Sequence, residues 1–199
     1  MNTRLGLRVQ GMSSGLIYVF TGEGKGKTSA AIGVAVRSLL LGKKVAWIAF
    51  YKQASWGLAE AKLVGKFPNL EMVFGGKGFH MSSKIKRVGD KGNVVVDTAS
   101  EEEHRAAAAA NLQLAIINLQ KKPFLLVMDE VLNAITDGLV EESEVMKVLA
   151  GRGETHIVLT GRGGEPTRMI LEGADLVTEC KKVKHPYDSG KLAVAGLDY

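Results

Sequence analysis

The sequence has a single cysteine and no long apolar run. In a chain of 199 residues, one cysteine, Cys180, excludes an internal disulfide and a cysteine-rich zinc cage, and it is typical of a reducing compartment. No stretch approaches the ~20 consecutive apolar residues that a membrane span needs. Residues 1–14 hold no apolar core of signal-peptide length. We therefore expect a cytoplasmic protein without a membrane segment.

The composition excludes several other classes of protein. Hydrophobic residues make up 46% and charged residues 24% of the chain, which excludes a collagen, a coiled coil and a largely disordered chain. The length suits one domain of ~100–200 residues, expected at residues 15–199 after an N-terminal extension at residues 1–14. The net charge of +5 favours an anionic partner, which could be nucleotide phosphates, a nucleic acid or an acidic cofactor.

Short apolar runs alternate with stretches of helical periodicity along the chain. We expect strands at residues 16–21, 45–50, 71–74, 124–127, 156–160 and 176–179. Helices are expected at residues 28–41, 58–67, 100–119, 141–149 and 166–172. Residues 75–98, rich in glycine and lysine, are expected to form a long loop. The alternation predicts an α/β fold with a mostly parallel central sheet, helices on both faces, and ligand sites at the carboxyl ends of the strands.

A glycine-rich segment with the sequence GEGKGKT, residues 22–28, lies between the first strand and the first helix. Its glycines let backbone N–H groups turn toward a polyphosphate, while Lys27 supplies a charge and Thr28 a hydroxyl for magnesium. The segment is shorter than the general pattern G-x-x-x-x-G-K-[ST], because the first position, counted back from Gly26, falls on Thr21. Its context predicts a single P-loop NTPase-like domain.

Two later strands also end in polar residues. Asp129 and Glu130 follow the strand at 124–127, where acidic oxygens hold the magnesium of a P-loop site directly or through water. Such a pair can also simply begin a helix. Arg162 follows the strand at 156–160 and can either bond phosphate oxygens bidentately or be a turn arginine on a solvated face.

With these elements in this order, the sequence resembles the P-loop type of ATP:corrinoid adenosyltransferase, the family that acts on cob(I)alamin or cob(I)yrinic acid a,c-diamide. The compact loop TGEGKGKT at 21–28 is close to the family's T-G-N-G-K-G-K form and shares its shortened spacing. The runs MDE at 128–130, LTGRG at 159–163, VKHPYDSG at 183–190 and GLDY at 196–199 also match. The resemblance extends from about Gly15 to the C-terminus.

The resemblance implies a reaction and a set of site residues. A Co(I) corrinoid attacks the 5′ carbon of ATP, triphosphate leaves and a cobalt–carbon bond forms, in adenosylcobalamin biosynthesis or salvage. No general base is needed, so Glu130 is expected to help hold a metal. The implied catalytic residues are Lys27, Arg162 and Phe79; the ATP-binding residues are Gly22, Glu23, Gly24, Lys25, Gly26, Lys27, Thr28, Ser29 and Arg162; the metal ligands are Thr28, Asp129 and Glu130. Mg²⁺ is the expected metal, with Mn²⁺ as an alternative.

The corrinoid side of the site is implied by the Gly78-Phe79 pair. Family members displace the lower axial ligand of the cobalt with aromatic side chains on a loop after such a pair, which eases reduction of Co(II) to Co(I). Met81 stands where the family often has tryptophan. Phe79, Met81 and Trp56 are therefore the expected corrinoid-binding residues. A homodimer and a flavoprotein reductant are implied as well.

Two other functions are compatible with parts of the sequence. A P-loop ATPase or kinase acting at the terminal phosphate predicts ADP as product and has Glu130 as its obvious catalytic base. A nucleic-acid-binding module is suggested by the basic stretch 77–91 and predicts strongly salt-dependent binding. That stretch has no interleaved aromatic residue besides Phe79, so we expect no nucleic-acid partner. Glu23, a carboxylate in the phosphate loop, is expected to point away from the phosphates.

Overall fold

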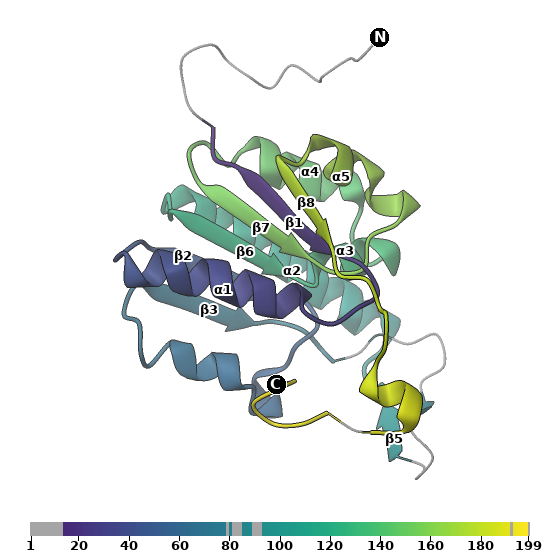
Figure 1. Ribbon diagram of the computed structural model, residues 1–199. Coiled ribbons are helices and arrows are strands. Elements are labelled where there is room, and N and C mark those ends of the chain that lie inside the picture. Colours follow the sequence, from purple (N-terminus) through teal and green to yellow (C-terminus); the bar gives the residue numbers. More distant parts are fainter. Residues whose placement is uncertain (1–13, 79, 81–84, 89–92, 192, 199) are drawn as a thin grey trace.

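The centre of the molecule is a parallel sheet with the strand order β3-β2-β6-β7-β1-β8 (Figure 1). The computed structural model describes residues 14–78, 80, 85–88, 93–191 and 193–198. The strands of the sheet are β1 (Ile17–Thr21), β2 (Val45–Ala49), β3 (Leu70–Phe74), β6 (Leu125–Asp129), β7 (His156–Thr160) and β8 (Leu176–Glu179). Every neighbouring pair in this sheet is parallel, so the predicted α/β fold is confirmed.

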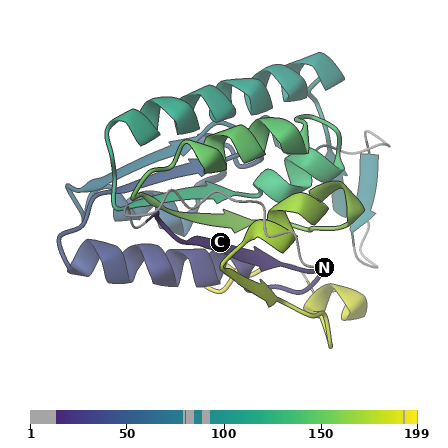
Figure 2. The same cartoon turned by 90° about the horizontal axis from the view of Figure 1, so that it is seen from above.

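Helices cover both faces of the sheet, as predicted. Helix α1 (Lys27–Leu40) lies on one face, and α2 (Glu101–Gln120) and α4 (Glu142–Ala150) lie on the other (Figure 2). Two short helices, α3 (Val131–Thr136) and α5 (Arg168–Gly173), share the hydrophobic core of α2 and α4. Both faces are thus apolar, which explains why the strands appear in the sequence as continuous apolar runs.

Strand β2 illustrates how one strand serves two cores. Val45, Trp47 and Ala49 pack in the core that includes α1, whereas Ala46 and Ile48 pack in the core of α2 and α4. All of them are at most 3% exposed. Successive side chains of a strand point to opposite faces, so this alternation is what the pleat requires.

Some predicted elements differ from the structure. The α-helix predicted at 58–67 is wrong: the 3₁₀ helix η2 (Ala59–Leu63) occupies part of this range, and a second 3₁₀ helix, η1 (Ala54–Trp56), precedes it. Gly57 separates them with a φ of 65°, a left-handed conformation that glycine adopts at little cost. Gly65 and Pro68 follow soon after, so a longer helix has no room to continue.

The region predicted as one long loop contains an antiparallel hairpin of β4 (Ile85–Val88) and β5 (Asn93–Val96). Helix α3 and a 3₁₀ turn η4 (Pro186–Ser189) were not predicted either. The helix predicted at 166–172 begins with a 3₁₀ turn, η3 (Glu165–Thr167), before α5. No helix in the described part of the chain is long and apolar enough to cross a membrane.

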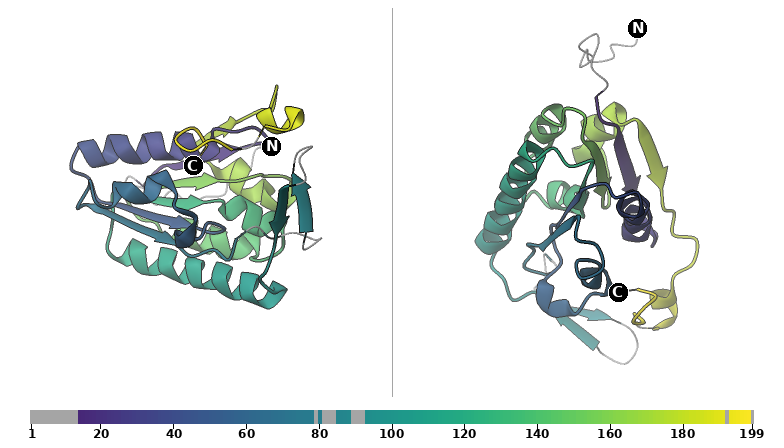
Figure 3. Two further views of the ribbon diagram at one scale, coloured as in Figure 1. Left: turned by 90° about the horizontal axis from the view of Figure 1, so that it is seen from below. Right: turned by 90° about the vertical axis from the view of Figure 1, so that its left-hand side faces the viewer.

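The parallel sheet brings the predicted polar segments to one edge. The glycine-rich loop follows β1, Asp129 ends β6, and Arg162 comes just after β7. The chain beyond β8 runs past the start of α1 (Figure 3). Because the carboxyl ends of all these strands meet at this edge, it is the place where a ligand site is expected in such a fold.

Candidate functional site

The glycine-rich loop leads from β1 directly into α1. Gly22 and Gly26 have φ values of 103° and 114°, which glycine alone adopts without strain. Gly26 is the N-cap of α1, and no side chain of the described residues caps this helix. The first N–H groups of α1 therefore face the loop without a side-chain acceptor, which is the arrangement that binds an anion at a helix N-terminus.

The chain after β8 holds this loop in place. The Gly24 N–H donates to the Cys180 carbonyl at 2.6 Å, and the Cys180 N–H donates to the Thr21 carbonyl at 2.7 Å. A Cβ atom on Gly22 or Gly24 would lie 2.7 Å or 2.6 Å from the Cys180 carbonyl oxygen. Glycine is needed at both positions because the backbone of another segment fills the space of a side chain.

Lys27 lies folded over the loop. Its ammonium donates to the carbonyl oxygens of Gly22 at 2.6 Å and Gly24 at 2.7 Å. Burial lowers the pKa of Lys27, and the guanidinium of Arg162 lowers it further. An anion in the loop would relieve both effects, so the electrostatics favour a bound polyanion at this position.

Asp129 is fully buried at the end of β6, and two hydroxyls hold it. Its Oδ1 accepts hydrogen bonds from Thr28 at 3.0 Å and from Thr160 at 2.6 Å. Its Oδ2 accepts no hydrogen bond from any described residue, but it lies 2.9 Å from the Lys52 ammonium as an ion pair. The structure thus brings together Thr28 and Asp129, two of the three predicted metal ligands.

Glu130, the third predicted metal ligand, begins α3 with a φ of 64°. Its backbone N–H donates to Thr160 Oγ1 at 2.8 Å, and the same hydroxyl bonds Asp129. Burial and the neighbouring Asp129 raise the pKa of Glu130 to about 7. A carboxylate with a raised pKa beside a second carboxylate is a place where a cation would be stabilised.

Arg162 and Glu23 form an exposed ion pair beside the loop. The Arg162 Nε lies 3.3 Å from Glu23 Oε2, and the two side chains are 62% and 68% exposed. The Arg162 N–H donates to Asn133 Oδ1, which fixes the turn after β7 to α3. Glu23 thus pairs with Arg162. Exposed ion pairs are weak, so the Arg162 side chain can leave Glu23 and move to a bound ligand.

The remaining predicted ATP-binding residues lie at the rim. The Lys25 ammonium pairs with Asp198 of the C-terminal run, and Ser29 is exposed on the first turn of α1. In the run at 183–190, the Tyr187 N–H donates to His185 Nδ1, and Asp188 pairs at 2.6 Å with the ammonium of Lys182, which lies just before the run. Of these contacts, the Lys25–Asp198 pair joins the C-terminal run to the phosphate loop, whereas the other two lie within the tail.

Of the predicted corrinoid-binding residues, Phe79 and Met81 lie outside the described residues. Trp56, at the end of η1, is half-buried. A Cβ atom on Gly78 would lie 3.6 Å from Trp56 Cζ2 and 3.2 Å from Gln53 Nε2, so Trp56 is a close neighbour of Gly78. The geometry therefore places Trp56 beside Gly78.

The sequence analysis missed the role of two charged residues. Lys52 lies 2.8 Å from Glu60 Oε1 as well as 2.9 Å from Asp129. Burial lowers the pKa of Lys52, but these carboxylates outweigh that effect and raise it. Lys52 follows the predicted strand at 45–50, and this position in the sequence predicts that it lies at the carboxyl edge of the sheet. Nothing in the sequence predicts its ion pair with Glu60.

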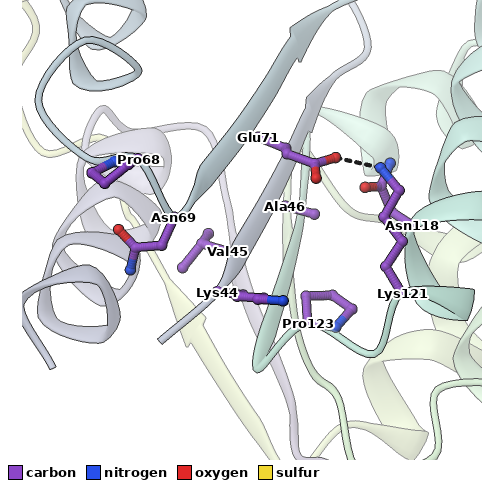
Figure 4. Close-up of a pocket in the computed structure, with 9 residues that line it drawn as sticks. All are labelled: Lys44, Val45, Ala46, Pro68, Asn69, Glu71, Asn118, Lys121 and Pro123. Atoms are coloured by element: carbon purple, nitrogen blue, oxygen red, sulfur yellow. Dashed lines mark hydrogen bonds and ion pairs between the residues drawn. The ribbon is translucent and has the colours of Figure 1, made fainter. Parts of the chain in front are cut away.

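A cavity of about 300 Å³ lies away from this site, at the amino ends of β2, β3 and β6 (Figure 4). It is lined by Lys44, Val45, Ala46, Pro68, Asn69, Glu71, Asn118, Lys121 and Pro123. None of these is a predicted site residue. We assign the chemistry to the opposite edge, where the loop, the carboxylates and the helix N-terminus converge.

Comparison with known proteins shows the family of this chain. The model of the family described as "ATP:corrinoid adenosyltransferase BtuR/CobO/CobP" matches residues 13–199. The chain belongs to the ATP:corrinoid adenosyltransferase family. The predicted resemblance is therefore confirmed, and the chain is an enzyme of this kind.

Curated relatives support the same assignment. The Escherichia coli K12 corrinoid adenosyltransferase is 35% identical over 189 residues, covering 93% of this chain and 86% of that protein. The corrinoid adenosyltransferase CobA of Salmonella typhimurium is 34% identical over 188 residues, with the same coverage of 93% and 86%. Among solved structures, a KaiC-like protein of Pyrococcus horikoshii has a TM-score of 0.43 and 16% identity, covering 85% of this chain and 74% of that one.

Proposed function

We propose that this adenosyltransferase transfers the 5′-deoxyadenosyl group of ATP to the cobalt of a Co(I) corrinoid, in adenosylcobalamin biosynthesis or salvage. The cobalt lone pair forms the bond to the 5′ carbon, the carbon–oxygen bond breaks, and its electron pair leaves with triphosphate. The observation that carries the proposal is the compact phosphate loop followed by Thr28, whose hydroxyl donates to Asp129. The family model matches the chain over residues 13–199.

The loop and its cations suit a leaving triphosphate. Negative charge grows on the departing oxygen, and preorganised donors stabilise such charge without reorganisation. The N–H groups at the start of α1, the Lys27 ammonium and the Arg162 guanidinium are the donors that we assign to this role. Lys27 would exchange its contacts with Gly22 and Gly24 carbonyls, 2.6 and 2.7 Å long, for phosphate oxygens.

The acidic end of β6 suits a hard divalent cation. Thr28, Asp129 and Glu130 offer oxygen ligands, which Mg²⁺ prefers. Asp129 Oδ2 accepts no hydrogen bond from the described residues and has the Lys52 ammonium at 2.9 Å as its ion-pair partner. We therefore propose Mg²⁺, with Mn²⁺ as an alternative, held by these residues directly or through water. When bound, the cation would neutralise charge on the triphosphate.

The corrinoid would approach from the side of Trp56 and Gly78. We propose that Phe79, with Met81 and Trp56, covers the lower face of the corrinoid and favours the four-coordinate cobalt that is easier to reduce. A flavoprotein reductant and a homodimer are proposed from the family resemblance. A cytoplasmic location is proposed because a single cysteine, Cys180, fits a reducing compartment.

One observation favours a second candidate function. The pKa of Glu130 is raised to about 7 by burial and by Asp129, a value that suits a general base near neutral pH. A P-loop ATPase or kinase would use such a base to activate water or a hydroxyl. It would produce ADP, whereas the proposed adenosyl transfer produces triphosphate.

The phosphate product separates these two functions. We would incubate the protein anaerobically with Mg-ATP, with and without chemically reduced cobalamin, and resolve ADP from triphosphate by ion-exchange chromatography. The proposal predicts triphosphate that forms with reduced cobalamin alone, in step with loss of the Co(I) absorbance. ADP formed at the same rate with and without cobalamin would support the alternative.

A further inference from the structure

Lys52 is a buried cation between two buried carboxylates. Its ammonium lies 2.9 Å from Asp129 Oδ2 and 2.8 Å from Glu60 Oε1. The side chains of Lys52, Glu60 and Asp129 are 13%, 7% and 0% exposed. Removing charges from water is costly unless each finds its partner, so an ion triad at this depth constrains the segments that carry it.

Asp129 does not depend on Lys52 for its orientation. Its Oδ1 is already fixed by the hydroxyls of Thr28 at 3.0 Å and Thr160 at 2.6 Å. The contact with Lys52 therefore adds charge compensation to a carboxylate that is held without it. The second partner of Lys52 is Glu60, which belongs to η2 and not to the phosphate site. Lys52 therefore also contacts a segment outside that site.

The same lysine is also joined to the corrinoid side through its backbone. We use "corrinoid-side segment" for residues 53–63, which contain Trp56 and Glu60. The Gly76 N–H donates to the Lys52 carbonyl at 3.1 Å, and Gln53 pairs with Gly75 in an antiparallel bridge. Residues 75–78 and the corrinoid-side segment thus both attach to the chain at Lys52.

We propose that Lys52 is a positioning residue that anchors the corrinoid-side segment to Asp129 through Glu60, and that its ammonium competes with the divalent cation for the charge of Asp129. The inference rests on the proposed function, because it assumes a metal-bound nucleotide on one side of Lys52 and a corrinoid on the other. It makes Lys52 the physical link between the two substrates.

This position predicts opposite effects on the two ligands. Without the ammonium, Asp129 presents its full charge, so a divalent cation at the site binds more tightly, by about tenfold for a unit charge removed within a few ångströms. Without the ion pair to Glu60, the corrinoid-side segment loses its anchor and the KM for the corrinoid rises. If Lys52 served stability alone, its replacement would weaken the binding of both the divalent cation and the corrinoid.

The experiment compares Lys52→Met, Lys52→Arg and Glu60→Gln, with Lys44→Met as the matched control at the opposite edge of the sheet. Mn²⁺ binding is titrated by electron paramagnetic resonance in the presence of ATP and without corrinoid. The KM for cobalamin is measured separately with chemically reduced Co(I). Thermal unfolding of each variant shows whether it is folded at the assay temperature.

We expect Lys52→Met to bind Mn²⁺ about tenfold more tightly and to have a KM for cobalamin raised several-fold. Lys52→Arg, which keeps the positive charge, should have the Mn²⁺ affinity and the KM for cobalamin of the wild type. Glu60→Gln leaves the ammonium on Asp129, so it should raise the KM for cobalamin without tighter Mn²⁺ binding. Lys44→Met should match the wild type in both.

Unchanged or weaker Mn²⁺ binding by Lys52→Met, or an unchanged KM for cobalamin in Glu60→Gln, would overturn the proposal. If Lys52→Met does not fold, Lys52→Gln takes its place in both assays, because its neutral amide removes the charge but can still donate hydrogen bonds to the two carboxylates. A wild-type protein that forms no cobalt–carbon bond would contradict the proposed function instead. The Mn²⁺ titration, which needs no corrinoid, would still decide whether Lys52 competes with the cation.

Discussion

Gly24→Ala is a sharp test of how the phosphate loop is built. The new Cβ would lie 2.6 Å from the Cys180 carbonyl oxygen and 2.7 Å from the Lys181 carbonyl carbon, both backbone atoms. Contacts this short force the loop and the chain after β8 apart. The hydrogen bond from the Gly24 N–H to Cys180, 2.6 Å long, would be lost with them.

The size of the effect follows from these contacts. Overpacking costs about 1–3 kcal/mol and a lost hydrogen bond about 1 kcal/mol, so the free energy of unfolding should fall by roughly 2–4 kcal/mol. For a chain of 199 residues this corresponds to a decrease of roughly 5–15 °C in the unfolding midpoint. Displaced loop N–H groups should also weaken ATP binding by about tenfold or more.

Gly33→Ala is the matched control. Gly33 lies within α1, and apart from its chain neighbours and the nearby backbone of that helix no described atom lies within 4 Å of a Cβ built there. This substitution should raise the free energy of unfolding by about 0.5–1 kcal/mol, because alanine is the better helix former. Differential scanning fluorimetry and calorimetric ATP titration measure both variants. A Gly24→Ala protein that melts and binds ATP like the wild type would refute this account of the loop.

Three further predictions concern single side chains. Lys27→Ala should reduce turnover by at least about a hundredfold, because the leaving triphosphate loses the ammonium of the phosphate loop. Wild-type turnover in steady-state kinetics would contradict the phosphate-loop assignment. Phe79→Ala should spare the reaction with chemically reduced Co(I) and impair it with a mild protein reductant, and equal losses in the two assays would remove its proposed role. In the metal-free protein, the free energy of unfolding should fall as the pH rises from 4.5 to about 7 and then level off, since the raised pKa of Glu130 lets the folded chain keep a proton that the unfolded chain has lost. Glu130→Gln should flatten this part of a urea-denaturation pH profile, and an unchanged slope would assign it to other groups.

The sheet, and the meeting of the glycine-rich loop with Asp129 at one edge of it, could be predicted from the sequence. Strands such as β2 are buried on both faces and appear as continuous apolar runs, and a parallel sheet collects their carboxyl ends at one edge. That logic places Thr28 near Asp129 before any coordinates, and the 3.0 Å hydrogen bond between them confirms it. The family assignment, carried by the shortened loop and the tail, is confirmed as well.

The parts that sequence reasoning missed depend on tertiary contacts. Glu60 lies within the helix predicted at 58–67, yet its side chain is 7% exposed and pairs with Lys52, which follows β2. The helix predicted at 58–67 is reduced to the 3₁₀ helix η2 (Ala59–Leu63), although the local periodicity favoured a full α-helix. The need for glycine at position 24 comes from the backbone at Cys180, more than 150 residues later in the chain. Local propensity contains no information about such distant partners.

The central claim is that the nucleophile attacks the 5′ carbon of ATP, and one labelling experiment tests it most directly. ATP labelled with ¹³C at the 5′ position would be incubated anaerobically with the protein, Mg²⁺ and chemically reduced cobalamin, and the corrinoid product examined by NMR and mass spectrometry. The account predicts the label on the carbon bound to cobalt, with one triphosphate released for each adenosyl group. Label found solely in ADP or unreacted ATP, with the corrinoid unlabelled, would contradict it.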